Sequence, residues 1–368
     1  MTIFVQKLPY PHDRQSGLSL VELMIALALG LVLTLGVTQV FLGSNKTYRT
    51  NDAIGFLQEN LRFSMSRISR DARMAGYYGC LIGEPTEHLN ISSADYKSEL
   101  YDFDRAVIGW EAPDTGLGKE YEIVGLSAGS GGWTNGSSDT LPAVISNNAI
   151  PGSDILVLSG TARADVVLDG NPSPPANTIS TKDDSGIEQD RVVLVVMGDC
   201  TGADRFQKTN APNSKTITKG VSNKPGNTNA TDLLVHTDES QVYRYRTTGY
   251  FVGVGVGGEP ALFQVPLEPG VANTPVELVS GVESMQVLYG LKAPAARAAE
   301  RYVPASSVAD WSDVVSVRVA MLMRSDDQIL EEDNAQTFNL VGTEIDPGAD
   351  RRARLVATST TGIRNRLE

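Results

Sequence analysis

Cysteine and histidine are scarce in this chain of 368 residues. It has two cysteines, Cys80 and Cys200, and three histidines, His12, His88 and His236. A structural zinc site needs four cysteine or histidine ligands with paired spacing, which these residues do not show. No histidine stands in a recognised nucleophile motif, so a Ser–His–Asp hydrolase has no support. We therefore expect no catalytic residue, no metal and no cofactor.

Basic charge is also in short supply. The formal net charge is −13 at pH 7, from 31 Lys and Arg against 44 Asp and Glu. An acidic surface repels a phosphate backbone, so the composition argues against a nucleic-acid partner. Asp183, Asp184, Glu188 and Asp190 form an acidic cluster whose spacing does not match an EF-hand. We expect a solvated loop there, with a calcium site as the alternative.

Proline and charge are both missing from the first long apolar run. Between Leu18 and Gly43 no proline occurs and Glu22 is the only charged side chain. About 20 apolar residues suffice for a helix to cross a bilayer, so 18–43 is predicted to be the transmembrane half of a helix. A carboxylate inside such a span costs about 2.5 kcal/mol or more, which makes Glu22 a functional candidate.

The helical pattern continues beyond this run. No proline occurs from Ser44 to Ala75, and apolar residues recur there every three or four positions, as on one face of an amphipathic helix. Gly76 and Gly79 supply a stop. We predict one helix from Leu18 to about Ala75, with an amphipathic half within 44–79 that needs a sheet to cover its apolar stripe. The stripe is Ile54, Leu57, Leu61, Met65, Ile68, Ala72 and Ala75.

The remainder of the chain, 80–368, has a β pattern. Short runs rich in Val, Tyr and Leu alternate with clusters of Gly, Pro, Asn and Asp. Gly253 to Gly258 has the glycine spacing of a dinucleotide loop, but no helix pattern follows, so we expect a glycine-rich hairpin. The predicted fold class is α+β, a long N-terminal helix packed on an antiparallel, β-rich head with long loops. The predicted strands are Ile155–Leu158, Val166–Leu168, Val192–Met197, Leu233–His236, Val242–Tyr245, Tyr250–Val256, Leu262–Val265, Val276–Leu278, Met285–Tyr289 and Val314–Met323.

The residues before the apolar run resemble a prepilin leader. A short polar stretch with Lys7 and Arg14 ends at Gly17, and Leu18-Ser19-Leu20-Val21-Glu22 follows. A secretory signal peptide would place its small-residue cleavage site after the apolar run. The resemblance implies that residues 1–17 are a leader, that prepilin peptidase cuts between Gly17 and Leu18, and that Leu18 is N-methylated. Leu18 departs from the phenylalanine that most prepilins carry there. The alternative is an uncleaved signal anchor.

The same resemblance implies a role for Glu22. After cleavage it is the fifth residue of the mature chain, where prepilins carry a glutamate that attracts the N-terminal amine of a neighbouring subunit. Both charges are costly in lipid, and a salt bridge with good geometry offsets part of that cost. The alternative is a glutamate that only reaches back to the cytoplasmic interface.

The two cysteines fit the compartment that such an anchor implies. A head behind it is periplasmic or extracellular, where disulfides persist. The even cysteine count predicts a bond between Cys80 and Cys200, which would join the end of the long helix to the β-rich head. Two buried free thiols are the alternative.

Several patches along the chain resemble PilW-type minor pilins of the type IV pilus. The resemblance implies a pilin fold enlarged by β insertions, and a place in the minor-pilin complex that primes assembly and sits at the extracellular fibre tip. The expected partners are prepilin peptidase, the inner membrane, other minor pilins of the PilX-, PilV-, PilE- and FimU-type and a large tip adhesin. The patches are Arg73–Cys80, Gly152–Val157, Gly198–Cys200, Ala203–Gln207, Val282–Gly290 and Trp311–Ser325.

Other functions stay open at this point. A GspJ-type pseudopilin of type II secretion is a close relative, although such heads are typically smaller. A membrane-anchored adhesion or ligand-binding module is a different class, and a tethered hydrolase has the least support. Surface pili, secreted enzymes and adhesion, scored after deletion of the gene, separate these functions.

Overall fold

A computed structural model gives the fold of the chain. It describes Gly17 and residues 19–129, 131–171, 176–222, 224–293, 296 and 298–366. The leader up to Ser16 and the predicted methylation site Leu18 lie outside the described residues. The chain divides into two compact units, Met1–Asp52 and Ala53–Glu368.

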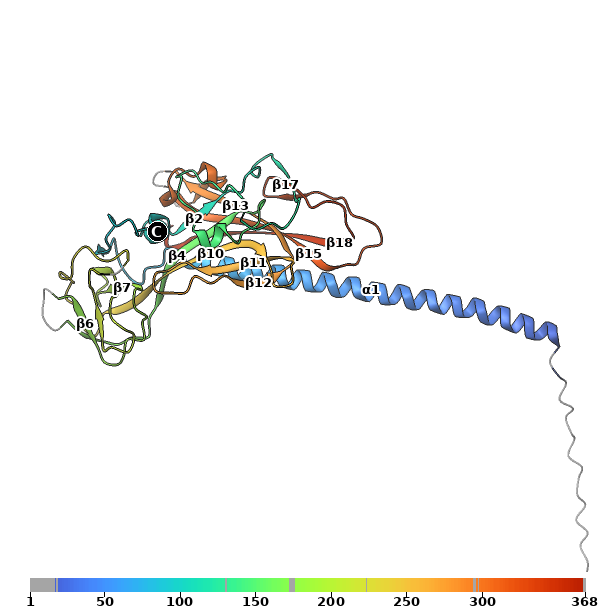
Figure 1. The fold of residues 1–368 in the computed structure, drawn as a ribbon, viewed down its shortest axis with the longest axis horizontal. Helices are drawn as coiled ribbons and strands as arrows, with labels where there is room; N and C mark the ends of the chain where they lie inside the picture. Colours follow the sequence, from blue (N-terminus) through green and yellow to red (C-terminus); the bar gives the residue numbers. More distant parts are fainter. Residues whose placement is uncertain are drawn as a thin grey trace, which may run out of the picture. The chain divides into compact units, whose positions relative to one another are not determined.

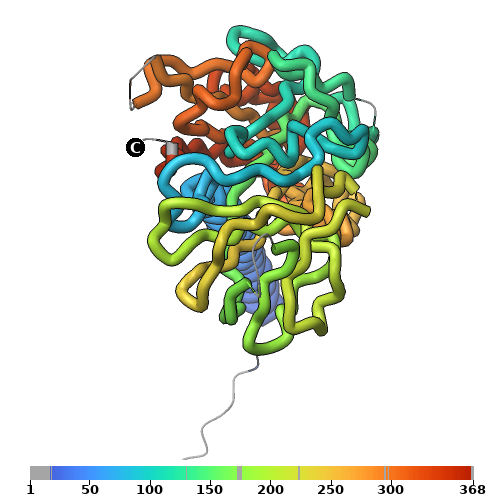
Figure 2. Tube along the Cα trace, turned by 90° about the vertical axis from the view of Figure 1, so that its left-hand side faces the viewer, coloured from blue at the N-terminus to red at the C-terminus, as the bar shows by residue number. Residues whose placement is uncertain are grey.

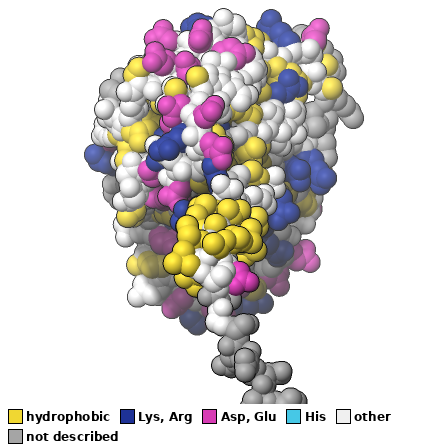
Figure 3. Space-filling view, turned by 90° about the vertical axis from the view of Figure 1, so that its right-hand side faces the viewer, with side chains coloured by type: hydrophobic (Ala, Val, Ile, Leu, Met, Phe, Trp, Pro, Cys, Tyr) yellow, Lys and Arg dark blue, Asp and Glu magenta, His cyan; other side chains and the backbone are white. Residues whose placement is uncertain are grey.

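The first unit contains the beginning of one long helix, α1 (Leu20–Met74). The large apolar side chains from Leu20 to Leu42 are all more than half exposed, and those of this part of α1 form the yellow cluster in Figure 3. By length and composition this helix can cross a membrane. Thr34 Oγ1 donates to Gly30 O at 2.7 Å, so its hydroxyl is satisfied inside the helix, as a lipid environment requires.

The second unit opens with the remainder of α1, which packs on the head (Figure 1). Arg67 Nη2 donates to Gln264 Oε1 at 3.1 Å, and Ser69 Oγ lies 3.2 Å from Ser359 Oγ. The helix ends at Met74, one residue before the predicted end, ahead of glycines with positive φ. The apolar stripe that this packing covers is Leu57, Leu61, Met65, Ile68, Ala72 and Ala75.

An eight-stranded sheet forms the larger part of the head, in the order β1-β8-β7-β10-β11-β12, with β4 on β10 and β2 on β4. The strand β10 is the central strand of this sheet. It pairs with β4 along one edge and with β7 and then β11 along its other edge. All its pairs are antiparallel except the short β1–β8 pair. The strands are β1 (Thr86–Glu87), β2 (Val107–Trp110), β4 (Ile155–Arg163), β7 (Val192–Val196), β8 (Ala203–Gln207), β10 (Gln241–Val254), β11 (Pro260–Pro266) and β12 (Val276–Ser280).

A buried ion pair closes the gap between β7 and β11 along β10. Arg191, just before β7, pairs with Glu268, just after β11. The N–H of Thr247 donates to Glu268 Oε1 at 3.0 Å, and the N–H of Leu267 donates to Thr247 O at 2.9 Å. The β10 backbone therefore stays hydrogen-bonded where neither strand reaches it, as buried backbone groups require.

A four-stranded antiparallel sheet follows, in the order β14-β13-β15-β18. The chain passes from the first sheet to the second at Gly281, between β12 and β13. Gly281 has φ 87, and a Cβ there would lie 2.7 Å from the carbonyl oxygen of Arg324. Glycine suits both the backbone angle and the close approach. The strands are β13 (Val282–Lys292), β14 (Ala299–Val303), β15 (Val314–Gln328) and β18 (Arg352–Gly362).

Two small sheets complete the head, β16-β17-β3 and β5-β6-β9. The largest hydrophobic core joins α1 to the two large sheets, and a second core gathers around β5, β6 and β9 with parts of β7, β8 and β10. The chain around β5 to β9 lies at the opposite end of the head from β13 to β18 (Figure 2). The remaining elements are α2 (Ser98–Tyr101), α3 (Ala143–Ser146), β3 (Glu120–Glu122), β5 (Leu168–Gly170), β6 (Thr178–Thr181), β9 (Thr216–Thr218), β16 (Phe338–Leu340), β17 (Thr343–Asp346), η1 (Ala305–Ser307), η2 (Trp311–Asp313) and η3 (Arg364–Arg366).

The predicted α+β fold is confirmed, with three differences among the predicted strands. The first is Val166–Leu168, of which only Leu168 lies in a strand, because β5 begins there. Val242–Tyr245 and Tyr250–Val256 were predicted as separate strands, but both fall largely within β10. The predicted strand Leu233–His236 is wrong, because Leu233 makes an isolated bridge to Ala176 and the segment is otherwise a loop.

Candidate functional site

The N-terminal junction places Glu22 in the first turn of α1. The N–H of Ser19 donates to Glu22 Oε2 at 3.0 Å, and the N–H of Glu22 donates to Ser19 Oγ at 3.2 Å. This reciprocal pair is a capping box, which satisfies N–H groups that have no partner within the helix. This capping role was not predicted from the sequence, although the Ser-x-x-Glu spacing is its signal. The carboxylate also lies at the positive end of the helix dipole.

The predicted cleavage point lies at the edge of the described chain. A Cβ placed on Gly17 would meet no atom within 4 Å, and Leu18 is outside the described residues. Cleavage after Gly17, N-methylation of Leu18 and pairing of Glu22 with an amine therefore stay predictions.

Cys80 and Cys200 form the predicted disulfide, with 5.4 Å between their Cα atoms. The bond joins the segment after α1 to the turn between β7 and β8, where the N–H of Ile82 also donates to Cys200 O at 3.1 Å. The prediction is confirmed, and the alternative of two free thiols is wrong. The end of the long helix is thus covalently linked to the first sheet.

Two of the patches that resemble PilW-type pilins meet in the structure, Gly152–Val157 and Val282–Gly290. The N–H of Asp154 donates to Met285 O at 2.7 Å, and Asp154 Oδ2 accepts from the N–H of Val287 at 2.8 Å. The first patch enters β4 and the second forms most of β13. The aspartate therefore fastens the first large sheet to the second.

Asp154 has an electrostatic neighbour in Glu111. Burial raises the pKa of Glu111 to about 7, and burial followed by the charge of Glu111 raises the pKa of Asp154 well above its usual range. Backbone N–H groups oppose these shifts: Ala112 donates to Asp154 Oδ1 at 2.9 Å and Ala305 donates to Glu111 Oε2 at 3.0 Å. Because both carboxyl groups accept hydrogen bonds from backbone N–H groups of other segments, they hold these segments of the head together.

A buried polar network surrounds Asp204 on β8. Its Oδ1 lies 2.7 Å from His88 Nε2 and its Oδ2 lies 2.8 Å from His236 Nε2. Burial favours the neutral carboxyl, but the hydrogen bonds from His236 and His88 outweigh it and lower the pKa of Asp204. Lys219 Nζ lies 3.0 Å from His88 Nδ1. Sequence reasoning selected neither Asp204 nor Lys219, because residues far apart in the sequence build the network.

No metal centre emerges from these side chains. Within the part of the chain that the structure describes, no group of three His, Cys, Asp or Glu residues is arranged to hold a metal ion. In the acidic cluster, Asp183, Asp184 and Glu188 are exposed and Asp190 is half-buried.

The glycine-rich segment Gly253–Gly258 lies at the hairpin between β10 and β11. Val254 pairs with Pro260 across it, and another strand follows instead of a helix. A dinucleotide loop leads from a strand into a helix. The segment is therefore a hairpin, as the sequence analysis expected.

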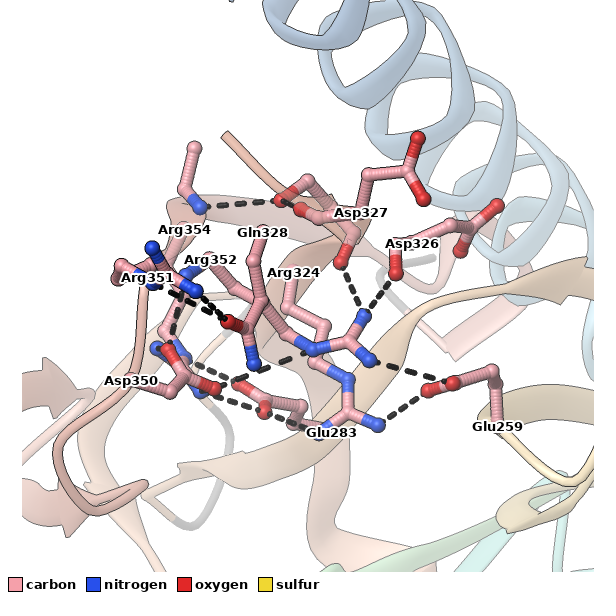
Figure 4. A network of polar contacts seen from close by, with 12 residues as sticks. Glu259, Glu283, Arg324, Asp326, Asp327, Gln328, Asp350, Arg351, Arg352 and Arg354 are labelled. Carbon is pink, nitrogen blue, oxygen red and sulfur yellow. Dashed lines mark hydrogen bonds and ion pairs between the residues drawn. The ribbon is translucent and has the colours of Figure 1, made fainter. Parts of the chain in front are cut away.

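A second polar network stands at the corner between the two large sheets (Figure 4). Glu259 pairs with Arg324 and Arg352, while Glu283 accepts from Arg324 Nη1 at 3.1 Å and from Arg354 Nε at 2.7 Å. The side chains of Arg354 and Glu283 are 1% and 2% exposed. Such deeply buried charges are costly unless they are paired, so the network fixes the corner in one arrangement.

Comparisons with known protein families gave one match in the C-terminal part of the chain and one at its N-terminus. Residues 249–365 match the family model described as Type IV Pilus-assembly protein W, and residues 12–38 match the Prokaryotic N-terminal methylation motif. The first match includes all the residues of the corner network, and the second includes the junction from Gly17 to Glu22. No curated protein and no solved structure matched the chain. Together, the prepilin motif, a helix long and apolar enough to cross a membrane and the disulfide-linked β-rich head support a PilW-type pilin, a minor pilin related to the type IV pilus.

Proposed function

We propose that this minor pilin takes part in priming pilus assembly and forms part of the pilus tip complex. The observation that carries the proposal is the match of residues 249–365 to an assembly protein, on a chain that also has the prepilin motif. Before assembly the protein spans the inner membrane once, with its N-terminus in the cytoplasm. After assembly it lies at the extracellular tip, with PilX-, PilV-, PilE- and FimU-type minor pilins and a large tip adhesin as partners.

Maturation starts at the junction. Prepilin peptidase cuts between Gly17 and Leu18, and the new N-terminal amine of Leu18 is methylated. The capping box uses Glu22 Oε2, whereas no described residue donates to Glu22 Oε1. One carboxylate can thus cap its own helix and also attract the N-terminal amine of a neighbouring subunit. A charge pair of this kind offsets part of the cost of holding both groups in lipid.

The test combines protein chemistry with genetics. We expect N-terminal sequencing of the membrane protein to start at Leu18, and Gly17→Leu to leave the full precursor in the inner membrane. A chain that starts at Met1 in the wild type would contradict the prepilin assignment.

Deletion of the gene is expected to remove surface pili and leave type II secretion intact. Normal pili with a loss of secreted enzymes would instead identify a GspJ-type pseudopilin. Normal pili with a loss of adhesion would identify a membrane-anchored adhesion or ligand-binding module.

A further inference from the structure

One carboxylate of the head belongs to a mostly buried residue but accepts no hydrogen bond from any other described residue. Glu99, in the short helix α2, is 9% exposed as a residue, but its carboxylate oxygens reach solvent, and no described residue other than Glu99 itself, through its own N–H, donates to them. The other buried carboxylates all accept hydrogen bonds from backbone N–H groups or from basic side chains. They are Glu111, Asp154, Asp204, Glu268 and Glu283. Glu99 differs from these carboxylates, because its oxygens face solvent and accept no hydrogen bond from another described residue.

Glu99 lies in a groove of about 790 Å³, a size at which ligand sites are common. Residues from five parts of the chain, including the helix α2, line it: from 95–101, 140–143, 189–190, 222 with 224, and 269–273. Leu100 and Tyr101, each 8% exposed, line it together with Leu141, Pro142 and Pro269. The groove thus combines apolar walls with a single unpaired carboxylate.

The charges of the groove favour a cation. Three carboxylates line it against two ammonium groups, and one of these, Lys224 Nζ, lies 3.5 Å from Asp95 Oδ2. The other, Lys97 Nζ, donates to Ala94 O at 3.5 Å. Burial raises the pKa of the Glu99 carboxyl, because the charged form is poorly solvated. A positive group beside it would restore that solvation.

Two other ligand chemistries fit the groove less well. A phosphate or another anion would meet Glu99, Asp95 and Asp190 at close range. A sugar commonly stacks on an exposed aromatic face, but the ring of Tyr101 is buried. A small free amine would leave the apolar walls uncovered.

We propose that this groove binds a segment of a partner protein that presents an arginine or lysine side chain between apolar residues. The cationic group pairs with Glu99, and its apolar neighbours cover Leu141, Pro142 and Pro269. The site belongs to the head alone, so the inference does not depend on the role in priming.

The test uses the full mature chain in lipid nanodiscs and two synthetic tripeptides, acetyl-Leu-Arg-Leu-amide and the same peptide with citrulline in place of arginine. Citrulline keeps the shape of the guanidinium but carries no charge. Binding is followed by saturation-transfer NMR, with empty nanodiscs as the blank. We expect the arginine peptide to bind with Kd of about 1 mM and the citrulline peptide about tenfold more weakly.

Glu99→Gln is expected to abolish this preference, whereas Glu332→Gln, an exposed change of the same kind, should preserve it. If Glu99→Gln fails to fold, Lys97→Gln carries the test, because removing this positive charge should strengthen binding of the arginine peptide severalfold and leave the citrulline peptide unchanged. Equal binding of both peptides to the wild type, or no binding of either, would overturn the proposal. So would a preference that survives Glu99→Gln.

Discussion

At the start of α1 the carboxylate of Glu22 is a helix cap and a charge at the same time. A glutamine there keeps an oxygen that can accept from the N–H of Ser19, and it removes only the charge. Glutamine and alanine substitutions therefore test different things at this position, and only glutamine isolates the proposed pairing with an amine.

We predict that Glu22→Gln inserts into the membrane and is cleaved normally, because the span becomes less charged and Gly17 is untouched. Docking into the fibre should fail, since removal of one member of a buried charge pair typically costs about 3–5 kcal/mol, or more than a hundredfold in affinity. The measurement is the number of pili and the co-purification of other minor pilins, in a strain that lacks the wild-type copy.

Ser19→Ala is the matched control. It loses half of the capping box, a cost of about 1 kcal/mol, and keeps the charge, so pili should form. Equal loss of pili in both variants would assign the effect to the cap. Normal pili with Glu22→Gln would show that the charge of Glu22 is not needed for docking into the fibre.

Glu111 gives a prediction about pH. Its pKa is about 7 in the folded head, against about 4.3 in an unfolded chain. Because the folded pKa is the raised one, the stabilisation is complete below about pH 4 and is lost as the pH rises through about 7. The neutral Glu111→Gln should therefore match the wild type at about pH 4 and exceed it at pH 8 by up to roughly 4 kcal/mol.

Thermal unfolding of both proteins across this pH range measures the difference. Glu332→Gln, an exposed change of the same kind, should follow the wild type at every pH. A constant offset between Glu111→Gln and the wild type would show that the carboxyl does not titrate with the raised pKa.

The elements that could be predicted from the sequence are those whose apolar residues recur with the period of a helix or of a strand. The stripe from Leu57 to Ala75 shows the period of a half-buried helix, and Val315, Val317, Val319 and Met321 alternate with more polar residues along β15. One face of the helix meets a core, so its pattern reports the fold. In β15 both faces are buried, with Val317, Val319 and Met321 in the largest core and Ala320 and Leu322 in a small core with Leu340 and Ile345. The disulfide also followed from simple arithmetic, since two cysteines allow one internal bond.

Other elements were beyond sequence reasoning because their partners lie far away in the chain. The strand β18 is rich in Thr, Ser and Arg, and among the described strands it pairs with β15, which lies far from it in the sequence for most of its length. Leu233–His236 is apolar enough for a strand but forms a loop that supports Asp204, where the N–H of Leu234 donates to Asp204 Oδ2 at 2.7 Å. Glu99 gave no signal because loops that converge only in the folded head create its groove.

The corner at Gly281 should not tolerate a side chain. Gly281→Ala forces an L residue to φ 87 and places its Cβ against the backbone of Arg324. We predict a loss of about 2 kcal/mol or more in the free energy of unfolding. Gly257→Ala, at the β10–β11 hairpin with nothing within 4 Å, should change it by less than about 0.5 kcal/mol. Equal unfolding midpoints for the two variants would show that the corner can relax.

Across the whole molecule, the disulfide closes a loop with a sequence separation of 120 residues. In the chain-entropy model a loop of this length gives up to about 5 kcal/mol of stabilisation. We predict that the double variant Cys80→Ala with Cys200→Ala unfolds at a clearly lower temperature. The wild type should fall to a similar midpoint in reductant, whereas the variant should not respond to it. A wild type indifferent to reductant would mean that the bond adds nothing.

The strand β10 belongs to both of the larger cores. Val242 contributes to the core around β5, β6 and β9, while Tyr250 and Phe251 contribute to the one that receives α1. Neither core can come apart without disturbing the hydrogen bonds that β10 makes to the strands of the other. The head should therefore open as one cooperative unit, and amide exchange at Val242 and Phe251 should report the same global opening free energy.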